Sequence, residues 1–131
     1  MEITNFNEIS DVFETGTELN LGIIPNTNIV KYGYSYNNEF ILYLQGLEKI
    51  DKIKNYLETD KYAKFYKWSS KGKMVNGEGN VTILETKDEK INGLKYIMKQ
   101  QNTSNDCKIN EGELENIFII KILVEKVYRF Y

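Results

Sequence analysis

The chain has 131 residues, which is the size of one domain, so we expect a single domain over residues 1–131. Its 17 basic and 19 acidic residues give a net charge of −2, so the chain lacks the basic excess with which proteins bind nucleic-acid phosphates. It has no histidine, which excludes Ser-His-Asp and Cys-His catalysis, histidine-ligated metals and imidazole acid–base chemistry. Any chemistry must therefore come from carboxylates, lysines, tyrosines, the single cysteine or a bound cofactor.

Cysteine content and apolar patterning indicate the compartment. Cys107 is the one cysteine, which excludes an internal disulfide and a cysteine-only zinc site and fits a reducing compartment. The first residues lack a basic segment followed by an apolar run, and Lys121 interrupts the most apolar stretch, residues 117–124. These features predict a cytoplasmic protein with no membrane segment and no metal site.

The first half of the sequence predicts a short helix followed by three strands. Apolar residues at helical spacing predict an amphipathic helix over residues 7–13. Turn-forming residues at 25–28 and at Asn37-Asn38 separate runs rich in aliphatic and β-branched residues. The strands predicted from these runs cover residues 18–24, 29–36 and 40–44.

The second half predicts two longer helices and three further strands. Apolar residues three and four positions apart predict helices over residues 47–58 and 87–101, and residues 102–116 are polar and irregular. Gly77 and Gly79 lie inside a predicted strand, which indicates a bulge, a barrel bend or the close approach of a backbone or ligand. The strands predicted in this half cover residues 62–68, 73–84 and 117–130.

This order of elements predicts a mainly β fold of the α+β class. Two main helices cannot supply a crossover for every pair of parallel strands, and tight turns join several of the strands. We therefore expect a mostly antiparallel sheet of six strands that is closed or partly closed into a barrel.

Four segments carry a resemblance to a known family. They are Ile29-Val30-Lys31-Tyr32-Gly33-Tyr34, Ile41-Leu42-Tyr43-Leu44-Gln45-Gly46, Lys49-Ile50-Asp51-Lys52-Ile53 and Val75-Asn76-Gly77-Glu78-Gly79-Asn80-Val81. In this pattern the chain resembles the pyridoxamine 5′-phosphate oxidase-like, FMN-binding split-barrel superfamily, in the flavin-nucleotide-binding branch related to nitroimidazole-resistance proteins. The resemblance implies an antiparallel six-stranded split β-barrel with two main helices.

The resemblance also implies a function and a set of site residues. Members of the family are generally homodimers that hold flavin mononucleotide (FMN) between subunits, so a flavin-dependent oxidoreductase acting on a small molecule is implied. Residues Val30 to Gly33 of the second predicted strand would offer backbone groups to the flavin ring. Gln45 and Gly46 would begin the loop that faces the phosphate. Lys49, at the start of a predicted helix, would attract the phosphate together with the helix dipole. The implied cofactor-binding residues are Val30, Lys31, Tyr32, Gly33, Gln45, Gly46, Lys49, Lys73 and Met74.

Departures from the family pattern support a second hypothesis. Glu48 stands where the family often has a basic residue, Gln45 where a histidine is common, and Met74 where a hydrogen-bonding residue is usual. A carboxylate beside a phosphate disfavours binding. The alternative is a non-enzymatic split-barrel module that has lost FMN and binds another anionic small molecule, such as a nucleotide or a tetrapyrrole. Heme is the weaker choice of ligand because the chain has no histidine to ligate its iron, although tyrosine or Met74 could serve.

The predicted last strand indicates how the protein assembles. Apolar residues at 117–120 and 122 occupy both faces of the strand, as expected where one face packs on the core and the other on a partner. We therefore expect a two-fold symmetric homodimer.

Overall fold

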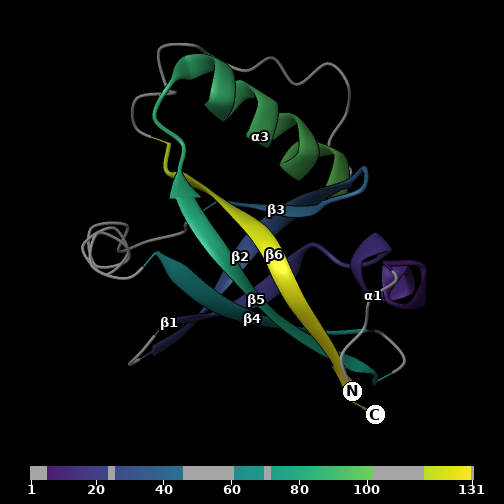
Figure 1. The fold of residues 1–131 in the computed structure, drawn as a ribbon. Helices are drawn as coiled ribbons and strands as arrows, with labels where there is room; N and C mark the ends of the chain where they lie inside the picture. The colour runs from purple at the N-terminus through teal and green to yellow at the C-terminus, as the bar shows by residue number, and fades with distance from the viewer. Residues whose placement is uncertain (1–5, 24–25, 46–60, 70–71, 102–116, 131) are drawn as a thin grey trace.

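The computed structural model describes residues 6–23, 26–45, 61–69, 72–101 and 117–130 (Figure 1). The elements in chain order are η1 (Phe6–Glu8), α1 (Ser10–Glu14), β1 (Glu18–Ile23), β2 (Asn26–Tyr36), β3 (Phe40–Gln45), β4 (Tyr62–Trp68), β5 (Met74–Ile83), α3 (Lys87–Gln100) and β6 (Ile119–Phe130). The helix predicted over residues 47–58 lies outside the described residues.

The six strands form a closed barrel in the order β1-β2-β3-β6-β5-β4, and β4 pairs with β1 to close it. Every neighbouring pair is antiparallel, which confirms the predicted six-stranded antiparallel barrel. The longer helix α3 lies across the outside of β2 and β3, and α1 lies near one end of the barrel (Figure 1). None of the described helices is long and apolar enough to cross a membrane.

The two predicted turns of the first half have different outcomes. Asn38 has a φ of 66°, the left-handed conformation that asparagine tolerates, and this confirms the turn between β2 and β3. The other predicted turn is shorter than expected, because Ile23 pairs with Asn26. Residues 26–28 therefore belong to β2, where ladder hydrogen bonds to β1 outweigh their preference for turns.

The glycines of β5 accommodate a bulge. The register with β6 shifts between Glu78 and Gly79, and a Cβ atom on Gly79 would overlap the backbone of Leu123. A residue with a side chain could not approach β6 so closely. Of the explanations open at the level of sequence, the bulge and the close backbone approach are confirmed.

The barrel interior forms the larger of two apolar clusters. Alternate residues of the strands fill it, and Val12 and Phe13 of α1 extend it at one end. The Phe13 ring is fully buried and packs edge-on against the rings of Tyr32, Phe40 and Phe65. The short helix therefore contributes side chains to the core.

A second cluster lies between the outside of the barrel and α3. It contains Tyr43, Leu84, Leu94, Ile97 and Ile119. Ile120 and Ile122 point into the barrel, whereas Ile119 lies under α3, so both faces at the start of β6 are covered within one chain. The apolar pattern that suggested a partner subunit is thus explained here by the chain's own helix.

Local sequence fixes where α3 begins. The Thr86 hydroxyl accepts a hydrogen bond from the Glu89 backbone N–H at 3.2 Å and donates one to the Glu89 carboxylate at 2.8 Å. Such a cap satisfies free N–H groups of the first turn and sets the helix start.

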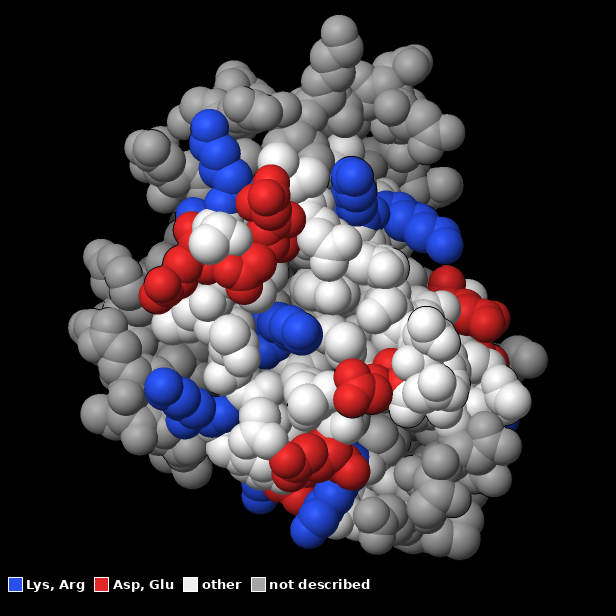
Figure 2. Space-filling view, turned by 45° about the horizontal axis from the view of Figure 1, so that its top comes forward, with Lys and Arg blue, Asp and Glu red and all other residues white. Residues whose placement is uncertain are grey.

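Described acidic and basic side chains lie interspersed on the face in Figure 2, with no broad patch of one sign.

Candidate functional site

The predicted flavin-binding residues of β2 and β3 divide between the core and the surface. Val30 and Tyr32 point into the barrel and are almost fully buried, so neither side chain can reach a cofactor outside. Lys31 is exposed and Gln45 is half-buried, and the two are partners in the β2–β3 register. The structure therefore brings Lys31 and Gln45 together on the outside of the barrel, at the open end of this hairpin.

Gly33 has a neighbour that the sequence could not show. A Cβ atom at this position would overlap the backbone of Tyr96 and Ile97 on α3. The missing side chain lets the helix pack directly on β2. Gly33 can offer a cofactor only its backbone groups.

Lys73 and Met74 lie on a different part of the barrel. Met74 pairs with Phe130 at the end of β6, whereas Gln45 pairs with Ile119 at its start. The ammonium group of Lys73 is 4.0 Å from a carboxylate oxygen of Asp11 on α1. Within one chain these two residues form a group separate from Lys31 and Gln45. Gly46 and Lys49, the other predicted ligands, lie outside the described residues.

Tyr32 is the centre of a buried polar network. Its hydroxyl donates to the Phe13 carbonyl at 2.6 Å, accepts from the Gln100 amide at 3.0 Å and lies 3.1 Å from the Thr15 carbonyl. Burial, and then the nearby Tyr34, raise the pKa of Tyr32 far above its ordinary value. The hydroxyl is thus a neutral structural group that ties the end of α1 to the end of α3.

Lys67 is buried beside Tyr32, with only 3% of its surface exposed. Its ammonium group lies 5.4 Å from the centre of the Tyr32 ring and donates to the Trp68 carbonyl at 3.5 Å. Among the described residues, no carboxylate forms an ion pair with it. Burial therefore lowers the pKa of Lys67.

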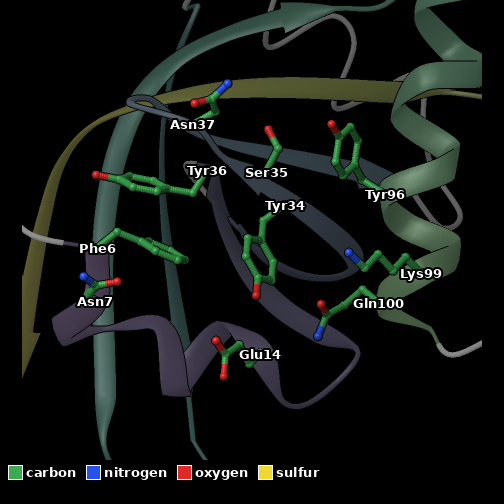
Figure 3. A pocket seen from close by; sticks show the side chains of 10 residues that line it. All are labelled: Phe6, Asn7, Glu14, Tyr34, Ser35, Tyr36, Asn37, Tyr96, Lys99 and Gln100. Carbon is green, nitrogen blue, oxygen red and sulfur yellow. The ribbon is translucent and has the colours of Figure 1, made fainter.

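A cleft opens where the tip of the β2–β3 hairpin meets η1 and the end of α3. Its volume is about 790 Å³, within the range of small-molecule pockets. The lining residues are Phe6, Asn7, Glu14, Tyr34, Ser35, Tyr36, Asn37, Tyr96, Lys99 and Gln100 (Figure 3). None of the predicted flavin-binding residues is among them.

Aromatic rings form two walls of this cleft. The Phe6 ring stacks on Tyr36, with centres 4.5 Å apart and an interplanar angle of 13°, and Tyr34 lies beside them (Figure 3). On the helix side, Tyr96 stacks on Tyr43 at 5.0 Å and 2°. Sequence reasoning missed the cleft because its residues come from four separate segments; the high tyrosine content of β2 was its one visible signal.

The cleft carries one charge of each sign. Glu14 lies below the Tyr34 hydroxyl and Lys99 extends from α3 (Figure 3). Burial, and then the negative charge of Glu14, raise the pKa of Tyr34. Tyr34 therefore presents a neutral hydroxyl to the cleft at ordinary pH.

Comparison with known proteins identifies the fold. No protein-family model and no curated protein matches the sequence. A solved structure provisionally named a 5-nitroimidazole antibiotic resistance protein, from Bacteroides thetaiotaomicron, superposes with a TM-score of 0.70 at 18% identity over 98% of this chain and 87% of that one. The chain has the split-barrel fold of pyridoxamine 5′-phosphate oxidase-like proteins.

Two further structures share this split barrel. One, provisionally named a pyridoxamine 5′-phosphate oxidase, from Listeria innocua, gives a TM-score of 0.64 at 14% identity over 95% of this chain and 96% of that one. The other, an FAD-binding protein from Mesorhizobium loti, gives 0.59 at 12% identity over 100% and 98%. At these identities the likeness establishes the fold, which confirms the resemblance seen in the sequence at that level.

Proposed function

We propose that this protein binds FMN and is a flavin-dependent oxidoreductase acting on a small molecule. The observation that carries the proposal is the full-length match of this small split barrel to an FAD-binding protein and to a pyridoxamine 5′-phosphate oxidase-like protein. A chain without histidine can perform such chemistry because a bound flavin supplies the redox group, while the protein binds and orients it.

The residues at the open end of the β2–β3 hairpin fit part of a flavin site. Lys31 is exposed beside Gln45, so a cation and an amide are available outside the barrel. Gly46 and Lys49 follow Gln45 closely in the sequence, and we assign the phosphate to them. Lysine and backbone N–H groups are suitable ligands for a phosphate.

We also propose that the protein is a cytoplasmic homodimer. The outer face of β4, β5 and β6 supports this, because Trp68 is 56% exposed there beside its register partner Met74. Tyr66 and Tyr128 lie on the same face and are partly exposed. Exposed aromatic surface of this kind favours association. Sedimentation should give twice the chain mass of 15.4 kDa at micromolar concentration, and the mass of one chain would contradict the dimer.

The alternative function is a binding module for another anionic molecule. Met74 favours it, because this partly exposed thioether offers no strong hydrogen bond where the family usually provides one. Thermal unfolding with FMN, FAD, heme and nucleotides separates the two functions. A ligand at 100 times its dissociation constant stabilises by about 2.7 kcal/mol, or roughly 10 °C for a domain of this size. We expect stabilisation by FMN; stabilisation by a nucleotide without flavin would establish the alternative.

A further inference from the structure

We propose that the cleft at the tip of the β2–β3 hairpin is a second binding site, which takes a flat aromatic molecule carrying an anionic group. The proposal does not depend on flavin binding. The hairpin contributes residues 34–37 to the cleft, at the end of β2 and the start of the turn, whereas the predicted flavin residues Lys31 and Gln45 lie at the opposite end of the same hairpin. A ligand could therefore occupy the cleft whether or not a flavin is bound.

The aromatic walls of the cleft favour a flat ring. Tyr34 and the Phe6–Tyr36 stack form one side, and Tyr96 lies on the helix side (Figure 3). Aromatic rings attract one another in offset-stacked and edge-on arrangements. A cleft lined by four rings therefore favours an aromatic ligand over a neutral polar solute. Tyr36 is 47% exposed, so a ligand would remove apolar surface from water.

The walls are held in place before any ligand arrives. Tyr96 is stacked on Tyr43, whose hydroxyl accepts a hydrogen bond from Asn92 at 3.4 Å. The Gln100 amide donates to the Gly16 carbonyl at 2.6 Å and to the Tyr32 hydroxyl at 3.0 Å. Such a preformed site loses little conformational entropy on binding.

The charged side chains of the cleft determine which polar groups a ligand should carry. Among the described residues, Lys99 forms no ion pair, so its ammonium group is available to an anion. Glu14 lies at another part of the lining, beside the Tyr34 hydroxyl, and can accept a hydrogen bond from a donor on the ligand (Figure 3). We therefore expect an anion at Lys99, the ring between the aromatic walls, and a hydroxyl or amino donor toward Glu14.

The edge of β2 adds backbone hydrogen-bonding groups. Pairing of β1 with β2 ends at Lys31, and one further bond joins the Tyr32 N–H to the Thr17 carbonyl. Beyond this point the described part of β2 pairs with β3 alone. Backbone groups on the other side of residues 34–36 can therefore supplement the side chains of the cleft.

Three matched probes test the proposal by calorimetry and by amide NMR shifts. The probe 3-(4-hydroxyphenyl)propionate has a ring, a donor and an anion; tyramine replaces the anion with a cation; 3-phenylpropionate lacks the donor. We expect the first probe to bind with a dissociation constant below about 1 mM and to shift amides of residues 34–37 and 96–100. Tyramine should bind at least about tenfold more weakly. Failure of the first probe to bind at millimolar concentration, or equal binding of tyramine, would overturn the proposal.

Variants assign the polar contacts. Lys99→Met should weaken binding of the anionic probes about tenfold, whereas Lys95→Met, an exposed lysine of α3 outside the cleft, should not. Glu14→Ala should abolish the preference for 3-(4-hydroxyphenyl)propionate over 3-phenylpropionate. If the two lysine variants weaken binding equally, the anion of the ligand does not bind at Lys99. Unchanged thermal midpoints would show that each variant is folded.

Discussion

The α-carbon of Gly33 on β2 lies directly against the backbone of Tyr96 on α3. A methyl group there would meet helix backbone, which cannot rotate away as a side chain can, so the helix would have to move off the barrel. Gly33→Ala should therefore lower the free energy of unfolding by about 1 to 3 kcal/mol, measured by urea unfolding. Gly22→Ala is the control, because its Cβ would be 3.4 Å from the nearest atom. Equal losses in the two variants would contradict the close packing of α3.

Tyr32 should contribute to stability through its hydroxyl. Tyr32→Phe keeps the ring in the barrel but leaves the buried Phe13 carbonyl and the Gln100 amide without this partner. An unsatisfied buried polar group costs about 1 to 3 kcal/mol, and urea unfolding should show a loss of this size. Tyr66→Phe on the outer face of β4 should cost less than about 0.5 kcal/mol. A Tyr32→Phe protein as stable as the parent would show that the network adds nothing.

Lys67 should make stability depend on pH. Because burial lowers its pKa in the folded protein, the unfolded chain binds more protons between that lowered value and the ordinary 10.5. The free energy of unfolding should therefore rise as the pH increases through this window, by about 1.36 kcal/mol for each unit of pKa difference. Lys67→Met should remove this slope, whereas Lys64→Met, an exposed residue of the same strand, should retain it. Parallel curves for Lys67→Met and the parent would be inconsistent with a perturbed Lys67.

The strands could be predicted because the two-residue alternation of side chains and the positions of the turn residues agree with the pairing of strands in the barrel. Lys67 shows where such agreement is incomplete. Lys67 occupies the same face of the predicted strand as Ala63 and Phe65, which indicates an inward position, whereas its charge argues for the surface. The Tyr32 ring and the space left by Gly16 accept the ammonium group, and neither can be inferred from spacing within β4.

The site was less predictable than the fold. A glycine in a strand fits a ligand and a neighbouring helix equally well, so Gly33 could not be assigned before α3 was seen to cover it. The apolar residues at 117–120 and 122 likewise fit a partner subunit and a helix of the same chain equally well, and Ile119 packs in the cluster under α3. The aromatic cleft unites Phe6, Tyr34 and Lys99, whose proximity depends on the closed barrel.

Charges beside the proposed phosphate should tune flavin affinity. Lys49→Glu would replace an attraction worth about 1.5 to 3 kcal/mol, so FMN should bind about tenfold to a hundredfold more weakly. Glu48→Lys should tighten binding, because it removes a carboxylate next to the phosphate. Lys52→Glu is the control for net charge. If the FMN titrations of the Lys49 and Glu48 variants overlay that of the parent, the phosphate lies elsewhere.

Flavin binding by this split barrel is tested most directly by titrating micromolar FMN with the purified protein and following FMN fluorescence. We expect saturable quenching at micromolar protein, with one FMN per chain, and a structured flavin absorption band in the bound state. Fluorescence that stays unchanged at saturating protein, in a protein that is colourless and unaffected by millimolar FMN, would contradict it.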